Sequence, residues 1–399
     1  MTATTDASHK TIVLAAGGTG GHIFPAEALA RELLARGRAV TLVTDRRGHA
    51  FGDSLPEVPV HRIRAASPGS GIVGKLKAAL QMGLGLLEAR ALLRQLGPAA
   101  VVGFGGYPSV PTVYAAAQAG IPTLLHEQNA VLGRANRMLI AGARRLAVAF
   151  ADVAVPAADD RTAGKIVRAG NPVRPAVAAR RTVPYAVPDD HGPIRLLVMG
   201  GSQGARIFSE ILPQAMARLP AALRNRIHLS QQCRPEDLEA TRLLLSALGL
   251  GGLDLQSFFR DVPDRLAACH LAVTRAGAST IAELTCIGRP AILVPYPHAT
   301  DDHQTANARQ LAATGAAWLV PQPDFTAETL AARLTDLLAS PGALGDAARN
   351  AQAWGTADAA AALADAVLAM IGGTTGANGN QRQEDAQHHA GTIAKGAAE

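Results

Sequence analysis

The chain carries the same kind of glycine-rich turn twice, each time directly after a short apolar run. The first is KTIVLAAGGTGGH at residues 10–22, and the second is IRLLVMGGSQG at residues 194–204. In each, the apolar run predicts a buried strand, and the glycines allow the backbone to turn sharply into a helix. Strand, glycine loop and helix form the unit of doubly wound parallel sheets. Because the unit recurs about half a chain later, the sequence predicts an α/β protein with two Rossmann-like domains.

The domain organisation follows from the alternation of strand-like and helix-like patterns, which continues through nearly the whole chain. A segment rich in Pro, Arg and Ala separates the two halves, and the C-terminal end is rich in Gly, Asn and Gln. We therefore expect a disordered tail at 1–9, an N-terminal domain at 10–175, a linker at 176–192, a C-terminal domain at 193–349 and a disordered tail at 372–399.

Charge and composition restrict the possible partners. The 399 residues are 48% apolar, which is enough for two buried cores and excludes wholesale disorder. The net charge of +6 favours an anionic lipid or a phosphorylated substrate. Nucleic acid is the weakest candidate, because no dense Lys/Arg stripe with interleaved aromatic residues appears. We therefore expect no nucleic-acid partner.

The cysteines and the apolar runs indicate a compartment. The three cysteines, Cys233, Cys269 and Cys286, are odd in number and lack metal-ligand spacing, which argues for a reducing environment. The N-terminus has no signal-peptide pattern. No run of about 20 uncharged apolar residues occurs, so we expect no membrane-spanning segment.

The first glycine turn, GGTGGH at 17–22, fits a ligand better than it fits simple packing. Free backbone N–H groups at a helix start favour negative charge. The turn lacks the Gly-Lys-Ser/Thr of a P-loop and the G-x-G-x-x-G of a dinucleotide site. His22 is a candidate general base or phosphate contact, since its unperturbed pKa suits proton removal near neutral pH. A tight turn with a packed histidine is the structural alternative.

The second half offers two further candidate sites for a diphosphate. Ser202, in the turn at 200–204, could donate to a phosphate, although a plain strand–helix turn is equally compatible. The segment RAGAST at 275–280 opens a helix with small residues, and Glu283 lies one turn later. Its carboxylate could accept hydrogen bonds from a ribose diol. The alternative, a capping box, requires a spacing one residue shorter than that from Ser279 to Glu283.

Polar side chains also follow other predicted strands. HEQN at 126–129 and GFGGYPS at 103–109 lie at the edge where ligands of open α/β sheets bind, so we expect HEQN to be a binding segment rather than core. Gln304 begins a helix and could recognise sugar hydroxyls. The neighbouring Asp301 and Asp302 are ordinary helix-start acids, and a metal site there is disfavoured.

Residues 72–93 carry apolar side chains at helical spacing with basic side chains beside them. This pattern predicts a helix whose apolar face is more often core than membrane-docking. A basic helix lying on an anionic membrane is the alternative.

Taken together, these motifs resemble the MurG family of peptidoglycan N-acetylglucosaminyltransferases, within glycosyltransferase family 28. The resemblance covers roughly residues 10–370 and depends on the order and spacing of its motifs. They are GGTGGH (17–22), GFGGYPS (103–109), HEQN (126–129), GNPVR (170–174), GGSQGA (200–205), RAGASTIAEL (275–284) and PYPHATDDHQTANA (295–308).

The resemblance implies a GT-B architecture with the active site between the domains, and a helix at 350–371 that returns to the N-terminal domain. It implies inverting transfer of GlcNAc from UDP-GlcNAc to the 4-hydroxyl of lipid I, the undecaprenyl-pyrophosphoryl-MurNAc-pentapeptide, which gives lipid II. It implies no cofactor and no metal. The expected location is the cytoplasmic face of the membrane, where the chain is peripheral and contacts an anionic surface.

The resemblance also assigns roles to residues at matching positions. His22 is the expected catalytic base, and Gln304 is expected to contact GlcNAc hydroxyls. The residues expected at the donor–acceptor junction are Thr19, Gly20 and Gly21. Those expected to bind the donor are Asn129, Arg174, Ser202, the backbone of Phe259, and the run Ala278, Ser279, Thr280, Ile281, Ala282 and Glu283.

Three other functions remain as alternatives. A UDP-GlcNAc 2-epimerase on the same scaffold would release UDP without an acceptor. A nicotinamide-dependent dehydrogenase would require the dinucleotide fingerprint, which neither turn contains. A nucleotide-sugar-binding regulator would not need hydrogen-bonding clusters in both halves.

Overall fold

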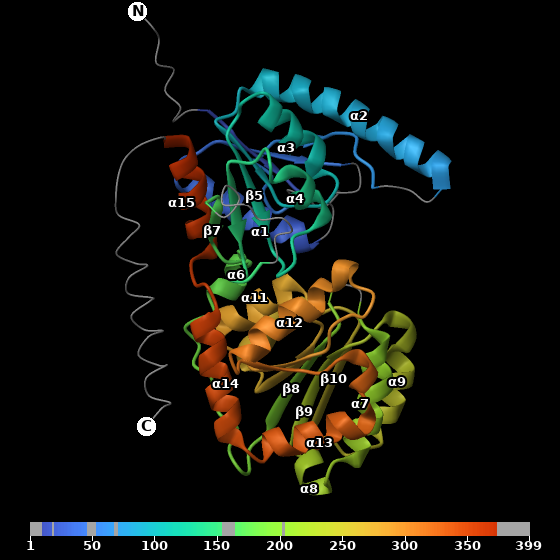
Figure 1. Ribbon diagram of the computed structural model, residues 1–399. Coiled ribbons are helices and arrows are strands. Elements are labelled where there is room, and N and C mark those ends of the chain that lie inside the picture. Colours follow the sequence, from blue (N-terminus) through green and yellow to red (C-terminus); the bar gives the residue numbers. More distant parts are fainter. Residues whose placement is uncertain are drawn as a thin grey trace, which may run out of the picture.

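The computed structural model describes residues 10–17, 20–45, 53–67, 71–153, 164–201 and 204–372, which form two parallel sheets, one in each half of the chain (Figure 1). The first sheet has the order β3-β2-β1-β4-β5-β6-β7, and the second has the order β10-β9-β8-β11-β12-β13. Every strand pairing is parallel. The predicted α/β fold with two Rossmann-like domains is confirmed.

In the N-terminal domain, helices cover both faces of the sheet. The strands are β1 (Ile12–Ala15), β2 (Val40–Thr44), β3 (Val60–Arg62), β4 (Ala100–Gly103), β5 (Thr123–Glu127), β6 (Arg145–Val148) and β7 (Ile166–Arg168), and the helices are α1 (Gly20–Ala35), α2 (Gly71–Leu96), α3 (Ser109–Gln118) and α4 (Arg134–Leu139). Alternate residues of β1 enter different cores: Leu14 packs with α1, whereas Val13 packs with α2, α3 and α4. This double burial explains why β1 is apolar throughout.

The C-terminal domain repeats this arrangement. Its strands are β8 (Ile194–Met199), β9 (Ile227–Gln232), β10 (Gly252–Gln256), β11 (Leu271–Thr274), β12 (Ala291–Leu293) and β13 (Ala317–Leu319). Its helices and single turns are α6 (Pro175–Ala178), α7 (Arg206–Arg218), α8 (Ala221–Arg224), η2 (Pro235–Asp237), α9 (Leu238–Ser246), α10 (Val262–Ala268), α11 (Ala278–Ile287), η3 (Thr300–Asp302), α12 (His303–Ala313), η4 (Gln322–Asp324), α13 (Ala327–Leu338) and α14 (Pro341–Trp354).

Both glycine turns lie where the strand order of their sheet reverses. The first follows β1, which lies between β2 and β4, and the second follows β8, which lies between β9 and β11. At such a switch point the neighbouring loops diverge and leave a crevice at the carboxyl edge of the sheet. The fold therefore provides one ligand-binding crevice in each domain.

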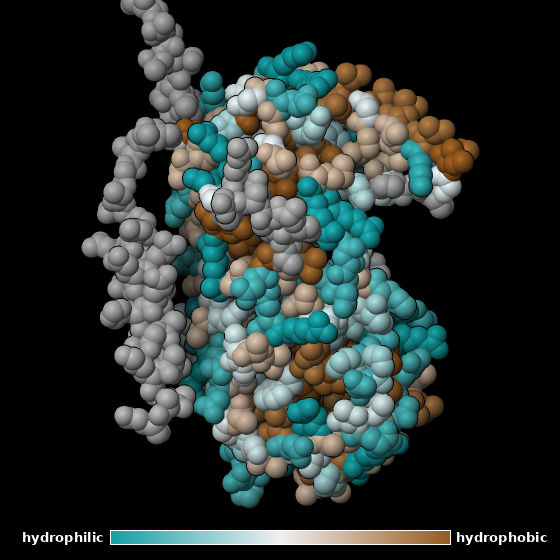
Figure 2. Space-filling model, viewed as in Figure 1, coloured by the Kyte–Doolittle hydropathy of each residue, from teal (hydrophilic) through white to brown (hydrophobic). Residues whose placement is uncertain are grey.

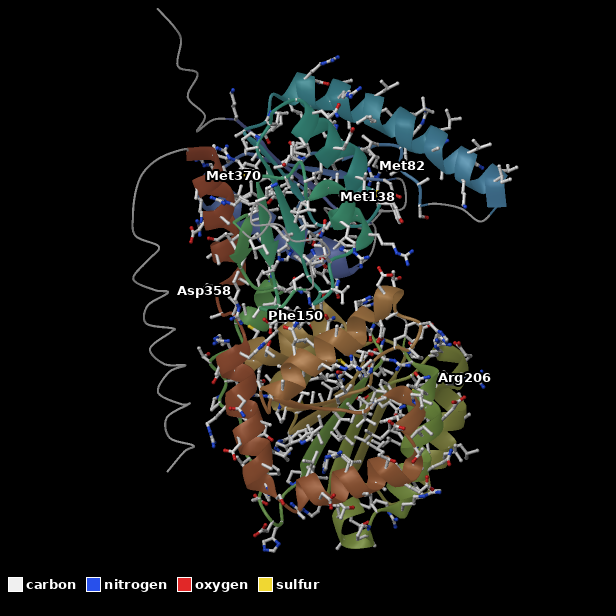
Figure 3. All side chains as sticks on the ribbon, in the orientation of Figure 1. Met82, Met138, Phe150, Arg206, Asp358 and Met370 are labelled. Atoms are coloured by element: carbon white, nitrogen blue, oxygen red, sulfur yellow. The ribbon has the colours of Figure 1, made fainter. Side chains whose placement is uncertain are left out.

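The chain returns to the N-terminal domain through two helices rather than one. The expected stretch 350–371 includes the end of α14, a break, and α15 (Ala359–Gly372). Asp358 lies in this break (Figure 3). A side chain at Gly355 would meet the Thr285 carbonyl oxygen, with its Cβ only 2.4 Å away, so the chain approaches α11 closely here. α14 packs on α11, whereas α15 packs on α1 (Figure 1).

The segment Pro341–Gly372 is long and apolar enough, by length and composition alone, to cross a membrane. In the structure, however, it is divided between α14 and α15. Leu363 and Val367 of α15 are fully buried in the N-terminal core. The apolar character of α15 is therefore explained by packing inside the protein.

Helix α2 contradicts the expectation of a core face. Ile72, Leu76 and Leu80 are 78%, 66% and 62% exposed, and Lys75 and Lys77 beside them are exposed as well. Only the opposite side packs on the domain, where Gly85 lies against the backbone of Arg64. Apolar surface covers the projecting part of this helix (Figure 2). The core interpretation was wrong because helical periodicity shows that a helix has an apolar face, but does not show what covers it.

Candidate active site

Three cavities between or beside the domains contain most of the expected site residues. We name each by a lining residue: the His22 cavity of about 310 Å³, the Glu283 cavity of about 280 Å³ and the Gln304 cavity of about 530 Å³. The first two are lined from both domains, whereas the third belongs to the C-terminal domain. Phe150, labelled in Figure 3, packs its ring on that of Trp354 and lines a separate, smaller hollow.

His22 lies in the first turns of α1, facing the glycine loop after β4. A side chain at Gly105 or Gly106 would meet the imidazole ring at 3.4 Å, so these two glycines, with φ of 85° and 73°, allow the loop to pack on it. His22 Nδ1 lies 3.2 Å from Oε1 of Gln128. Burial lowers the pKa of His22 below its usual value, although Glu127 and Gln128 oppose the shift. The ring is therefore neutral at neutral pH, as a general base must be.

Glu127, at the end of β5, organises the loop that follows it. Its carboxylate accepts hydrogen bonds from the backbone N–H groups of Asn129 (3.1 Å) and Gly133 (2.8 Å) and from the side chain of Asn136 (2.8 Å). Multiple donors stabilise a buried carboxylate without a cation. His126, Glu127 and Gln128 are at most 2% exposed, so the expectation that these side chains are not core is wrong. Glu127, Gln128 and Asn129 nevertheless line the His22 cavity, as a binding segment would.

The two domains are joined at this loop by Asn307 of α12. Its Oδ1 accepts from the backbone of Ala130 at 2.7 Å, and its Nδ2 donates to Oδ1 of Asn129 at 3.1 Å. Asn307 is fully buried, so these bonds are shielded from water. Asn129, expected to bind the donor, lines the His22 cavity and at the same time forms the domain junction.

A second junction is electrostatic and more exposed. Asp301 accepts from Arg134 at 3.0 Å and from Arg137 at 3.1 Å, which joins η3 to α4. Asp301 and Asp302 have φ of 54° and 50°, a left-handed conformation that is uncommon for residues other than glycine. The arginines hold the pKa of Asp301 below its usual value. Its carboxylate is thus paired with two arginine side chains of the other domain.

The Glu283 cavity combines residues that are far apart in the sequence. Nε and Nη2 of Arg174 both contact Oε1 of Glu283, at 2.9 and 2.8 Å, and the guanidinium lies 5.4 Å from the ring centre of Phe24. Burial raises the pKa of Glu283, while Arg174 acts in the opposite direction. The structure therefore pairs the two residues that were expected to contact the donor separately. The other expected residues that line this cavity are Gly20, Gly21, Phe259, Ser279 and Thr280.

The N-terminus of α11 separates the expected run 278–283 into two groups. Ser279 and Thr280 face the Glu283 cavity, and the buried Ser279 Oγ has no hydrogen-bond partner among the described residues. Ile281 and Ala282 instead line a small hollow on the other side of the helix. The Ile281 N–H is also already bonded to the Gly277 carbonyl at 3.0 Å. Helical geometry explains this division, because neighbouring residues on a helix point in different directions.

Gln304 is held by backbone groups at two strand ends. Its Oε1 accepts from the N–H groups of Ala276 (3.2 Å) and Tyr296 (3.0 Å), which leaves its amide nitrogen as a donor at the cavity wall. Arg234 and Arg275, which were not among the expected site residues, line the same cavity. Arg206, at its outer edge, is labelled in Figure 3. This cavity offers the positive charge and the hydrogen-bond donors that a sugar diphosphate requires.

Three of the expected site residues either lie outside the described residues or line no part of these cavities through an exposed side chain. Thr19 and Ser202 lie outside the described residues. Phe259 is buried beneath the guanidinium of Arg265, 3.9 Å from its ring centre, while Phe258 is exposed. In the described part of the chain, no group of three His, Cys, Asp or Glu side chains could hold a metal ion.

Sequence reasoning missed Asn307, Phe24 and the two arginines that bind Asp301. Asn307 lies in the quoted motif 295–308, three residues after Gln304 and thus on the same helical face. That spacing could have drawn attention to it. No local pattern identifies Phe24 or Arg134, because their partners lie in other parts of the chain.

Two parallel-sheet domains that face each other across a cleft, which residues of both domains line, form the GT-B architecture of glycosyltransferases. A model of the glycosyltransferase family 28 N-terminal domain matches residues 12–148, and a model of the family 28 C-terminal domain matches residues 195–363. The chain belongs to glycosyltransferase family 28. The expected family is confirmed.

Similar proteins support this assignment over nearly the whole chain. The UDP-N-acetylglucosamine--N-acetylmuramyl-(pentapeptide) pyrophosphoryl-undecaprenol N-acetylglucosamine transferase of Rhodospirillum centenum is 61% identical over 365 residues, which is 92% of this chain and 96% of that protein. The protein of the same name from Paramagnetospirillum magneticum is 56% identical, over 92% of this chain and 98% of that protein.

Solved structures agree in fold. The crystal structure of Acinetobacter baumannii MurG matches with a TM-score of 0.74 and 31% identity, covering 90% of this chain and 99% of that chain. A UDP-GlcNAc 2-epimerase from Neisseria meningitidis matches with a TM-score of 0.63 at 13% identity, covering 90% and 99% of the two chains. The second match therefore concerns the fold alone.

Proposed function

We propose that this chain is a hexosyltransferase that transfers GlcNAc from UDP-GlcNAc to lipid I, which yields lipid II for peptidoglycan. The relatives at 61% and 56% identity carry the name of this activity. The observation that carries the proposal is the cleft itself, where the His22 cavity and the Glu283 cavity each combine residues of both domains. A transferase needs such a site, because donor and acceptor must meet in a fixed orientation.

In the proposed mechanism, UDP-GlcNAc binds mainly to the C-terminal domain. The ribose hydroxyls donate to Glu283, whose Oε2 remains available because both Arg174 contacts use Oε1. The diphosphate lies near the N-terminus of α11, and Gln304 donates to the sugar. Ser202, which is outside the described residues, keeps its expected role as a phosphate contact. Negative charge grows on the departing UDP, so N–H donors already oriented there stabilise the transition state.

The acceptor then attacks from the side of His22. The 4-hydroxyl of the lipid-linked MurNAc forms a bond to the anomeric carbon as the bond to UDP breaks, and this single displacement inverts the configuration. His22 takes the hydroxyl proton, a role supported by its lowered pKa and its place in the cavity wall.

We further infer that the enzyme is peripheral at the cytoplasmic face of the membrane and docks through α2. Exposed Ile72, Leu76 and Leu80 would enter the interface, while Lys75 and Lys77 would meet anionic headgroups. Helix α2 belongs to the domain that holds His22, so docking there would present the cleft to an acceptor whose lipid stays in the bilayer.

The test is UDP release from UDP-GlcNAc, measured with and without a soluble lipid I analogue. We expect release that depends on the analogue, with the GlcNAc recovered on the analogue. UDP release with free N-acetylmannosamine and no acceptor would instead indicate the epimerase alternative and contradict the transferase.

A further inference from the structure

Gln128 is a buried amide placed between two histidines and two backbone carbonyls. It directly follows β5 and is 2% exposed. Its Nε2 lies 3.1 Å from the carbonyl oxygen of Phe104, 3.2 Å from that of His126 and 3.0 Å from His126 Nδ1. Its Oε1 lies 3.2 Å from His22 Nδ1. Each end of the amide therefore has a defined partner.

These contacts determine which way the amide faces. A carbonyl oxygen can only accept a hydrogen bond, so the atom beside the Phe104 and His126 carbonyls must be the NH₂ group. The oxygen of Gln128 then faces His22 and can only accept. His22 must therefore carry its proton on Nδ1, and Nε2 is the nitrogen that keeps a lone pair.

His126 leads to the same orientation independently. Its Nε2 lies 2.9 Å from the carbonyl oxygen of Gly170, which requires a proton on Nε2. Burial lowers the pKa of His126 to about 4, so the ring is neutral and its Nδ1 is an acceptor. That acceptor needs a donor, which the NH₂ group of Gln128 supplies. A directed chain of hydrogen bonds thus runs from His22 through Gln128 and His126 to Gly170.

We propose that Gln128 is a positioning residue that fixes His22 in the Nδ1–H tautomer and thereby directs the basic Nε2 toward the acceptor hydroxyl. A free histidine side chain in water prefers the opposite tautomer, with the proton on Nε2, which would block its use as a base there. The inference rests on the proposed role of His22 as base. It explains why a buried glutamine lies beside His22: the amide oxygen selects one tautomer of the ring.

Other charged and titratable groups lie around His22. Glu127 raises the pKa of His22, whereas His303 of α12 lowers it. His126 of β5 couples to the same ring. The other ionisable groups that line this cavity are Tyr107, Arg134 and Asp301. The backbone of Phe104 also forms a hydrogen bond to the ring and raises the pKa of His22. Gln128 Oε1, 3.2 Å from Nδ1, is the side-chain partner of that nitrogen.

The first experiment uses the unmodified full chain. Two-bond ¹H–¹⁵N correlation spectra of ¹⁵N-histidine-labelled protein distinguish the tautomers, and His22→Gln and His126→Gln variants assign the two signals. We expect Nδ1–H for His22 and Nε2–H for His126. A neutral His22 with its proton on Nε2 would overturn the proposal, and this readout does not depend on the reaction catalysed.

The second experiment replaces the amide. Gln128→Met keeps the length of the side chain but removes the acceptor, so His22 should shift toward the Nε2–H form and kcat should fall about 10- to 100-fold. The KM for UDP-GlcNAc should stay unchanged. His126→Phe is the matched control for the tautomer, because the two carbonyls still orient Gln128. An unchanged His22 tautomer in Gln128→Met would contradict the proposal.

A pH profile provides a third, separate readout. Gln128→Glu places a carboxylate beside Nδ1–H, which should raise the pKa of His22 and move the acid limb of kcat to higher pH. An acid limb at the wild-type position would count against the proposal. If the tautomers are as expected but no transfer to a lipid I analogue occurs, the proposed function fails while the positioning role of Gln128 stands.

Discussion

The two domains prepare their halves of the cleft in different ways. In the N-terminal domain, His22 and Glu127 find hydrogen-bond partners within that domain: Gln128 holds His22, and Glu127 is bonded to the loop that follows it. In the C-terminal domain, Glu283 is paired with Arg174 from outside its own sheet, and Ser279 has no hydrogen-bond partner among the described residues.

This difference indicates that the domains contribute to different steps. A network that is already satisfied needs no rearrangement when a substrate arrives, so its groups can serve the chemical step directly. Groups that are unpartnered or paired across the cleft can instead exchange partners with a ligand. We therefore expect changes in the N-terminal network to alter kcat, and changes in the C-terminal pocket to alter donor affinity.

The largest effect should come from the N-terminal side. His22→Ala removes the proposed base, and we expect kcat to fall by about 100- to 1000-fold. The Kd for UDP, measured by calorimetry, should change little, since the ribose and diphosphate contacts remain. Unaltered turnover with a lipid I analogue would show that His22 is not the base. It would also contradict the expectation that the N-terminal network determines kcat.

Membrane attachment should also belong to the N-terminal domain alone. Replacing Lys75 and Lys77 of α2 by Gln should weaken binding to vesicles containing anionic lipid by roughly 30-fold, at about 1 kcal/mol per lysine. Co-sedimentation measures the effect. The paired control, Arg218→Gln with Arg242→Gln on the C-terminal domain, should bind like wild type. Equal loss in both double variants would indicate nonspecific attraction.

On the C-terminal side, Glu283→Gln should weaken UDP binding by about tenfold, because hydrogen bonds to a charged acceptor are stronger than those to an amide. The kcat at saturating donor should change much less. Because burial raises the pKa of Glu283, wild-type UDP affinity should also begin to fall at a higher pH than a solvated glutamate would allow. Glu239→Gln, at an exposed position on α9, is the control.

The smallest effect should come from the exposed junction between the domains. Asp301→Asn weakens the contacts to Arg134 and Arg137, and exposed ion pairs contribute about 0–1 kcal/mol. We expect the midpoint of thermal unfolding to change by no more than a few degrees. Asn307→Ala leaves the buried N–H of Ala130 and the side chain of Asn129 without their hydrogen-bond partner. It should therefore lower the free energy of unfolding by more, about 1–3 kcal/mol. The reverse order would show that charge, not the buried amide, joins the domains.

Sequence alone determined the two sheets, the family and most of the positions that line the cavities. Local signals suffice for these features, because the strand and glycine-turn pattern occurs twice and alternates with helical patterns along the chain. The same reasoning placed His126, Glu127 and Gln128 at the correct edge of the sheet but missed their burial, since polarity suggests exposure when the hydrogen-bond partners are unknown.

Only the tertiary structure decided which face of α2 is exposed, that Arg174 pairs with Glu283, and that Asn307 joins the domains. These partners are far apart along the chain: 109 residues separate Arg174 from Glu283, and 177 separate Ala130 from Asn307. No short-range pattern encodes such contacts, because they form only when two separately folded sheets dock and their loops meet. The pairing of groups across the cleft is therefore a property of that docking.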